Sequence, residues 1–125
     1  MVSIVDDDES VRDGIVDLVT AMGFDVEAFG RAEDFLQSSS IASTACLITD
    51  MRMPGMTGLE LHERLIASGK AIPTIVITAF PKEVDRARAV RNGVVCYLAK
   101  PFDDNQLAAC ITSALEPRDP NTRES

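Results

Sequence analysis

Short apolar runs alternate with helical patterns along the 125-residue chain, and this order restricts the possible folds more than any other feature of the sequence. The runs are residues 3–5, 25–28, 45–49, 73–78 and 96–98, of which 25–28 is the weakest. Most of them do not alternate apolar with polar residues, which is typical of strands that are buried on both faces of a parallel sheet. Helices must then cover both faces, and right-handed crossovers favour a doubly wound α/β fold.

The segments between the runs have helical spacing and recognisable ends. Apolar residues recur on one helical face at Val11, Ile15, Leu18, Val19 and Met22. Ser10 with Asp13 predicts the start of this helix, and Gly23 predicts its end. Thr57 with Glu60 predicts the start of a third helix that ends at Gly69. The other helices are predicted over residues 31–39, 82–92 and 104–115.

Composition excludes several classes of protein. Twelve Lys and Arg against twenty Asp and Glu give a net charge of -8, which argues against direct nucleic-acid binding by this domain. The chain lacks both a basic, apolar leader and the ~20 apolar residues that span a bilayer. The three cysteines have apolar neighbours and no CxxC spacing, and they predict reduced, buried thiols in a cytoplasmic protein. The lone His62 is expected on an exposed helix face, without chemistry.

The last nine residues differ from the rest of the chain. Residues 117–125 are polar and contain two prolines, which is typical of a linker or a frayed end. The sequence therefore predicts one domain over residues 1–116, followed by a tail.

Polar residues stand where the predicted strands end, and in a doubly wound fold this edge of the sheet holds the ligand site. Asp6 and Asp7 follow the first strand, and Asp50 follows the third. If these strands are neighbours, three carboxylates converge. Like charges ~4 Å apart repel by ~4 kcal/mol at a dielectric constant of ~20, so the cluster requires a cation or a raised pKa. Oxygen ligands without His or Cys favour Mg²⁺.

Two further strand ends complete a site suited to phosphoryl transfer. Asp50 is a candidate carboxylate nucleophile toward phosphorus. Lys100, after the fifth strand, supplies a positive charge for phosphoryl oxygens, and Thr78, after the fourth, supplies a hydroxyl. Asp8 and Glu9 are better explained as acids at a helix N-terminus.

Four sequence blocks carry a resemblance to a known family. IVDDD, LITDMRMPGMTG, IVITA and YLAKPF occur in this order and at fitting spacing. The chain resembles a two-component response-regulator receiver domain over residues 1–116. With GFDVEAFGRAEDFL, the pattern is most similar to receivers of nitrogen-fixation-type regulators, whose output domain is often a helix-turn-helix.

The resemblance implies a fold and a set of roles. The fold is flavodoxin-like (βα)5, with a parallel sheet in the order 2-1-3-4-5 and helices on both faces. Asp50 accepts a phosphoryl group from a sensor histidine kinase. Asp7, Asp50 and the backbone carbonyl of Arg52 bind Mg²⁺ directly, and Asp6 binds it through water. Thr78 and Lys100 match the family's switch hydroxyl and lysine.

Further expectations concern the switch. Tyr97 matches the aromatic residue that moves inward when the threonine engages phosphate, and the Lys100–Pro101 bond is typically cis. The domain is implied to be a signalling switch for transcription and not an enzyme with an external substrate. A homodimer is expected through the fourth helix, the fifth strand and the fifth helix. Phe80-Pro81 departs from the family pattern, and the large side chain is expected to slow water entry and lengthen the phosphorylated lifetime.

Three alternatives remain open from the residues. Asp6-x-Asp8 loosely matches the nucleophile motif of haloacid-dehalogenase-type phosphatases, although Ser10 stands where Thr or Val is usual. A receiver-like binding module that is never phosphorylated would retain the same fold. A flavodoxin is disfavoured because no phosphate loop follows the first strand and the chain has no Trp.

Overall fold

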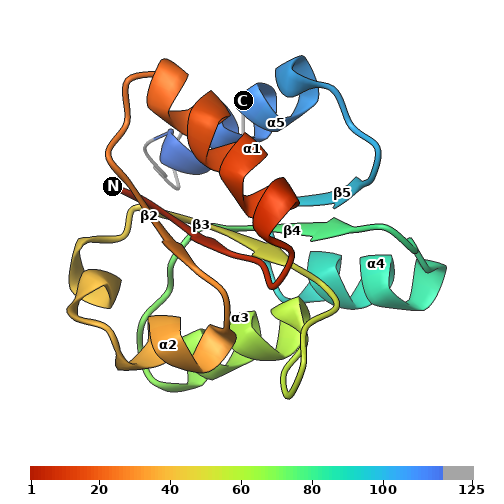
Figure 1. Cartoon of the computed structure of the whole chain (residues 1–125). Coiled ribbons are helices and arrows are strands. Elements are labelled where there is room, and N and C mark those ends of the chain that lie inside the picture. The colour runs from red at the N-terminus through yellow and green to blue at the C-terminus, as the bar shows by residue number, and fades with distance from the viewer. Residues whose placement is uncertain (117–125) are drawn as a thin grey trace.

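A computed structural model describes residues 1–116 and contains one five-stranded parallel sheet (Figure 1). The strands are β1 (Val2–Val5), β2 (Val26–Phe29), β3 (Cys46–Asp50), β4 (Thr74–Thr78) and β5 (Cys96–Ala99). The helices are α1 (Glu9–Ala21), α2 (Ala32–Gln37), α3 (Gly58–Ala67), α4 (Glu83–Arg91) and α5 (Asp104–Leu115), with a 3₁₀ turn η1 (Ser39–Ser43). The sheet order is β2-β1-β3-β4-β5, which confirms the predicted fold class.

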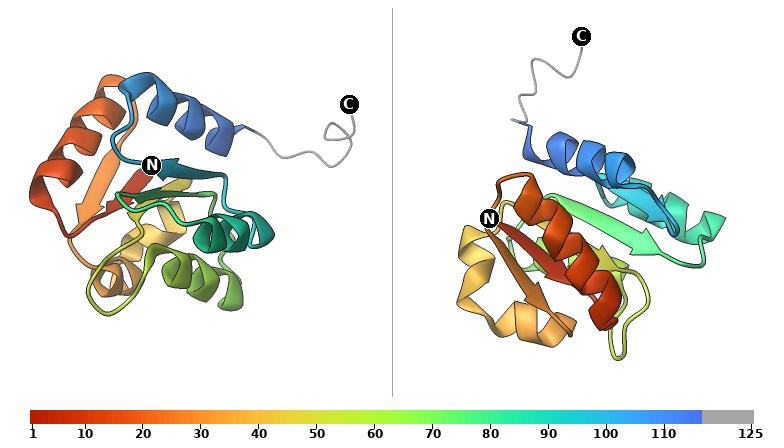
Figure 2. Two further views of the ribbon diagram at one scale, coloured as in Figure 1. Left: turned by 90° about the vertical axis from the view of Figure 1, so that its right-hand side faces the viewer. Right: turned by 45° about the horizontal axis from the view of Figure 1, so that its top comes forward.

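The helices form one layer on each face of the sheet. α1 and α5 cover one face, and α2, α3 and α4 cover the other (Figures 1 and 2). Buried side chains of α1 and α5 pack on alternate strand residues such as Ile4, Ile48 and Ile77. The intervening strand residues, including Val5, Leu47 and Val76, pack toward α2, α3 and α4. Burial on both faces explains why the strands are continuously apolar.

The local sequence predicted some of the helix ends correctly and others not. The Thr57–Glu60 capping box is present, and Gly23 ends α1 with a φ of 93°. The predicted start at Ser10 is wrong, because Asp8 caps α1 by accepting hydrogen bonds from the backbone N–H groups of Ser10 and Val11. A second capping box, Asp103 with Gln106, and the η1 turn were not predicted.

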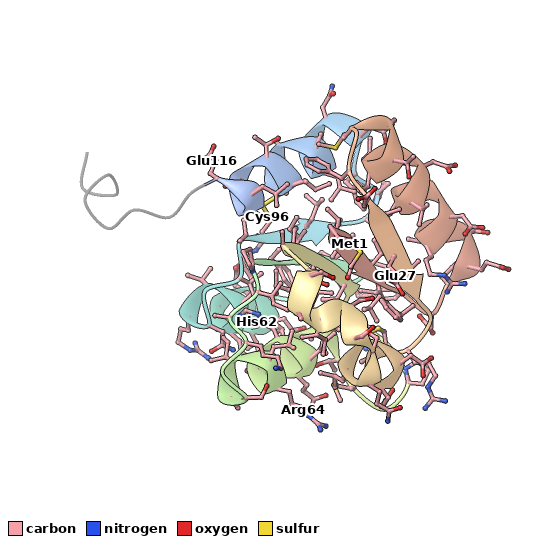
Figure 3. The ribbon with its side chains drawn as sticks, turned by 90° about the vertical axis from the view of Figure 1, so that its left-hand side faces the viewer. Met1, Glu27, His62, Arg64, Cys96 and Glu116 are labelled. Carbon is pink, nitrogen blue, oxygen red and sulfur yellow. A yellow bond between two sulfur atoms is a disulfide. The ribbon has the colours of Figure 1, made fainter. Side chains whose placement is uncertain are left out.

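His62 corrects one prediction. It lies on α3 with only 4% of its surface exposed, and Figure 3 shows it between α3 and α4. Its Nδ1 is 3.0 Å from the Thr74 hydroxyl oxygen, and its Nε2 donates to the Asn92 carbonyl oxygen over 2.9 Å. These contacts tie α3 to the start of β4 and to the end of α4. Helical spacing did not reveal them, because both partners are distant in sequence.

The cysteines correct another prediction. Cys96 and Cys110 are joined by a disulfide, with 6.1 Å between their Cα atoms. Cys46 is a free, buried thiol as predicted, and burial raises its pKa to about 12. The expectation of three reduced thiols is therefore wrong, because the packing of β5 against α5 brings two of them together. The cysteines no longer indicate a reducing compartment.

Two remaining expectations concern the tail and the membrane. The predicted tail, 117–125, lies outside the described residues. Within residues 1–116, no helix is both long and apolar enough to cross a membrane.

Candidate functional site

The predicted strand-end residues meet at one edge of the sheet. β1 pairs with β2 on one side and with β3 on the other. The strand order therefore reverses at β1, between β1 and β3. Val5 lies opposite Thr49, which places Asp6 and Asp50 at the same level on neighbouring strands. Carboxylate oxygens of Asp6, Asp7 and Asp50 all lie within 4.8 Å of one another. The site therefore occupies the switch point, where open α/β sheets bind their ligands.

Asp50 is held by three neighbouring elements. Lys100, at the end of β5, donates from Nζ to Asp50 Oδ1 over 2.9 Å. The Arg52 backbone N–H donates to the other carboxylate oxygen over 3.1 Å. Gly58, at the start of α3, packs so closely that a Cβ atom there would lie 2.5 Å from the Asp50 carbonyl oxygen. Asp50 is buried, with 8% of its surface exposed.

Asp6 is almost fully buried and only partly hydrogen-bonded. Its Oδ1 accepts from the Asp8 backbone N–H over 2.9 Å. Its Oδ2 has no hydrogen-bond partner, and Lys100 Nζ is 3.8 Å away. Burial raises the pKa of Asp6 to about 6, and the negative charges of Asp50 and Asp7 add to the effect. A buried carboxylate oxygen without a partner is the environment expected beside a cation.

Asp7 and Asp8 have different surroundings despite their adjacent positions. Asp7 is exposed and contributes its carboxylate to the cluster. Asp8 instead caps α1. The phosphatase motif Asp6-x-Asp8 requires two carboxylates that act together, so the capping role of Asp8 argues against that alternative. The oxygen-only donor set fits Mg²⁺.

The residues predicted for switching lie beside this site. Thr78 is buried, and its hydroxyl oxygen accepts from the Phe80 N–H over 3.1 Å. Tyr97 is half-buried, and its hydroxyl oxygen accepts from the Lys82 N–H over 3.4 Å. The Arg86 guanidinium carbon lies 5.0 Å from the centre of the Tyr97 ring. The Lys100–Pro101 bond is cis, as expected.

A pocket of about 240 Å³ opens over the carboxylates. Its lining is Asp6, Asp7, Asp8, Asp50, Arg52, Ala79, Phe80 and Lys100. The Phe80 ring lies at the rim, 64% exposed, with the Arg52 guanidinium carbon 5.6 Å from its centre. Thr78 is fully buried and does not line the pocket.

Arg12 was missed by the sequence analysis. Its Nη1 donates to the Asp6 backbone carbonyl over 2.7 Å and so fixes the loop that carries the acidic residues. The available signal was its position: Arg12 is the first base in the chain and follows the acidic run by one helical turn.

The comparisons with known proteins decide the family. The response regulator receiver domain model matches residues 2–112. The chain belongs to this family. The receiver is 38% identical to nodulation protein W of Bradyrhizobium diazoefficiens over all of this chain and 55% of that protein. It is 35% identical to the transcriptional regulatory protein FixJ of the same organism, over 94% of this chain and 57% of FixJ.

Solved structures agree with the assignment. The receiver superposes on the FixJ N-terminal domain with a TM-score of 0.82 and 36% identity, covering 94% of each chain. It superposes on the response regulator StyR with a TM-score of 0.81 and 43% identity, covering 91% of this chain and 58% of StyR. The similarity to nitrogen-fixation-type regulators is confirmed. The receiver spans about half the length of the curated relatives it matches.

Membership places the domain in two-component signalling, where receivers act as switches. This excludes the flavodoxin and phosphatase alternatives.

Proposed function

We propose that this receiver is phosphorylated on Asp50 in a Mg²⁺-dependent reaction and that the phosphoryl group switches its conformation. The observation that carries the proposal is the Asp50 carboxylate, held by Lys100 at 2.9 Å and placed beside the unpartnered oxygen of Asp6. Phosphoryl transfer requires a nucleophile, a fixed positive charge and oxygen atoms that can bind a metal ion.

In the phosphoryl transfer, one bond forms and one bond breaks. An Asp50 carboxylate oxygen attacks the phosphorus of a phosphohistidine, the P–N bond breaks, and the imidazole leaves with its electron pair. The product is an acyl phosphate on Asp50. Lys100 moves its hydrogen bond from the free carboxylate to a phosphoryl oxygen and so stabilises the developing charge. Hydrolysis of the acyl phosphate on the same residues resets the switch. The receiver therefore acts on itself and not on an external metabolite.

The metal site is proposed on this chain's oxygens. Asp7, Asp50 and the Arg52 carbonyl would bind Mg²⁺ directly, and Asp6 would bind it through water. When bound, the ion would neutralise carboxylate and phosphoryl charge. The unpartnered Asp6 oxygen and the proximity of the three carboxylates support this assignment.

The conformational response is proposed to run through Thr78 and Tyr97. The Thr78 hydroxyl would leave the Phe80 N–H and donate to a phosphoryl oxygen, and the Tyr97 ring would turn inward. A shift from mostly inactive to mostly active requires ~5.5 kcal/mol of differential stabilisation, and a doubly charged phosphoryl group supplies several charge-assisted hydrogen bonds.

The output surface is proposed to comprise α4, β5 and α5. Val84 and Val90 on α4 are 76% and 71% exposed, and such apolar side chains suit a homodimer contact. The domain is proposed to act in the cytoplasm and to regulate transcription through a partner or an attached domain, since its relative FixJ is a transcriptional regulatory protein. The net charge of -8 supports the absence of direct nucleic-acid contact.

Intact-mass measurement after incubation with Mg²⁺ and acetyl phosphate tests the proposal. We expect one added phosphoryl group, which is lost with EDTA or in Asp50→Asn. Asp25→Asn is the matched control, because Asp25 is an exposed acid that precedes β2 at the opposite edge of the sheet, and it should retain the adduct.

Absence of an adduct on a protein with an intact circular dichroism spectrum would contradict phosphorylation and favour the binding module that is never phosphorylated. An adduct that persists in Asp50→Asn would place the phosphoryl group on another residue.

A further inference from the structure

Cys96 and Cys110 form a contact between β5 and α5, and neither cysteine has a role in the proposed phosphorylation. Cys96 begins β5, and Cys110 lies in the second turn of α5. Their Cα atoms are 6.1 Å apart, inside the range that a disulfide spans without backbone movement. Figure 3 shows Cys96 beneath α5, where the two sulfur atoms meet. The sheet and helix therefore hold the two residues at bonding distance.

The surroundings suit both oxidation states. Cys110 is buried in the core cluster that includes Leu107 and Ile111, and Cys96 packs against the same cluster. A free thiol behaves as a small apolar side chain and leaves no strong donor or acceptor without a partner. Reduction of the disulfide thus leaves two acceptable core side chains. The fold does not require the disulfide, so the bond can be opened and closed without unfolding the domain.

The two sulfurs differ in access to solvent. Cys96 is half-buried, whereas Cys110 is only 8% exposed. Thiol–disulfide exchange begins at the accessible thiol, and the less accessible thiol then displaces the leaving group. Cys46 is fully buried with a pKa raised to about 12, so the same chain contains an unreactive reference thiol.

We propose that Cys96 and Cys110 are a reversible redox site that responds to small-molecule disulfides, with Cys96 attacking and Cys110 resolving. The Cys96 thiolate attacks one sulfur of the small disulfide, whose S–S bond breaks and releases one thiol, leaving a mixed disulfide on Cys96. The Cys110 thiolate then attacks the Cys96 sulfur and releases the second thiol. The receiver loses two hydrogen atoms, and one small disulfide becomes two thiols.

The oxidised pair joins the first residue of β5 to α5. The next residue along β5 is Tyr97, and both elements belong to the proposed output surface. Oxidation adds a covalent link between α5 and the sheet, and reduction leaves α5 held by the packing of Leu107, Ile111 and Ala114 alone. The redox site is chemically independent of Asp50, so its failure and the failure of the phosphorylation proposal are distinguishable.

Differential alkylation tests the site on the full chain. Protein reduced with dithiothreitol and then transferred to oxidised glutathione is expected to lose two mass units. After denaturation, Cys46 alone should react with N-ethylmaleimide, and a digest should contain a peptide pair joined through Cys96 and Cys110. Renewed treatment with dithiothreitol under native conditions should restore three reactive thiols. Hydrogen exchange in α5 is expected to be slower in the oxidised form.

Single variants test the order of attack. Cys110→Ser should retain one glutathione on Cys96, because no resolving thiol is present. Cys96→Ser should acquire little adduct, and Cys46→Ala should behave as the wild type does. Retention of three thiols in oxidised glutathione, a bond that includes Cys46, or a bond that native reduction cannot open would each overturn the proposal.

Discussion

Three consecutive aspartates differ sharply in their surroundings. Asp6 is buried with an unpartnered oxygen, Asp7 is exposed within the cluster, and Asp8 caps α1. The side chains of a strand end alternate in direction, and the chain then turns into a helix whose free N–H groups require an acceptor. Identical residues thus acquire different roles from the backbone that carries them.

Asp6 predicts a pH dependence. Its pKa is raised from 3.8 to about 6, so between these pH values the folded, metal-free protein holds a proton that the unfolded chain has lost. The stabilising contribution is present below about pH 4 and is lost as the pH rises through about 6, with a change of about 3 kcal/mol. Urea unfolding of wild type and Asp6→Asn between pH 4 and 7.5, without Mg²⁺, measures this difference.

Added Mg²⁺ should stabilise the wild type more at pH 7.5 than at pH 5, because the ion requires ionised carboxylates. A wild-type stability that follows that of Asp6→Asn at every pH would contradict the prediction.

Phe80 predicts a kinetic effect. Its ring lies at the rim of the site pocket against Arg52, where it would restrict the approach of water to the proposed acyl phosphate. Phe80→Ala is expected to raise the dephosphorylation rate by about threefold to tenfold. Loss of the phosphorylated mass with time, after removal of acetyl phosphate, provides the rate. Val84→Ala is the control, since Val84 is equally apolar and exposed but does not line the pocket. Equal rates for all three proteins would exclude a shielding role.

At the scale of elements, α3 contributes to the site through its first residue. A Cβ atom at Gly58 would meet the Asp50 carbonyl oxygen at 2.5 Å and the Thr49 side chain at 3.2 Å. Gly58→Ala is therefore expected to displace α3 from β3, to destabilise the fold by about 1–3 kcal/mol and to slow phosphorylation of Asp50. Denaturation midpoints and the rate of acetyl phosphate labelling check both effects.

Gly14 offers a matched control within α1. No atom lies within 4 Å of a Cβ atom added there, so Gly14→Ala should stabilise the protein by up to about 1 kcal/mol through helix propensity alone. A Gly58→Ala protein that resembles Gly14→Ala would show that α3 can adjust without disturbing Asp50.

The fourth helix is held by polar contacts more than by core packing. Ala89 is the one buried residue within α4. Arg88 pairs with Glu63 of α3 through two hydrogen bonds of 2.8 and 2.6 Å, and Asn92 donates to the same carboxylate over 2.6 Å. The Arg88 contact also lowers the pKa of Glu63. We expect α4 to be among the more easily displaced helices, because few apolar contacts hold it.

Arg88→Ala is expected to accelerate hydrogen exchange in α4 while lowering global stability by less than about 1 kcal/mol, because both partners are partly exposed. Arg91→Ala is the comparison, since among the described residues Arg91 forms no ion pair. Unchanged exchange in Arg88→Ala would mean that the remaining contacts hold the helix.

At the scale of the whole molecule, the domain boundary is a proposal with a direct test. Ile111 and Ala114 are the last buried residues of the described chain, and the match to the family model ends at residue 112. A protein of residues 1–116 is expected to unfold within about 2 °C of the full chain and to accept the phosphoryl group equally well. A protein of residues 1–109 should not fold, because it lacks Cys110, Ile111 and Ala114. A large loss of stability in the 1–116 protein would place the boundary beyond residue 116.

Sequence predicted the elements that depend on local rules. The capping box at Thr57 and the Gly23 helix end rest on contacts within four residues, and both are present. His62 was assigned to the wrong environment because its partners, Thr74 and Asn92, lie 12 and 30 residues away. The disulfide was missed for the same reason, since spacing along the chain does not show that β5 and α5 face one another.

The sequence alone determined the succession of strands and helices, the burial of the sheet on both faces and the residue types at each strand end, because periodicity and end signals are local properties of a chain. The tertiary structure alone decided which strand ends are neighbours. Pairing of β1 with β3 brings Asp6 and Asp50 together, and the position of β5 brings Lys100 to Asp50 across 50 residues of sequence. Such contacts arise when two layers of helices pack on one sheet. That packing depends on the whole molecule and cannot be found in any single segment of the sequence.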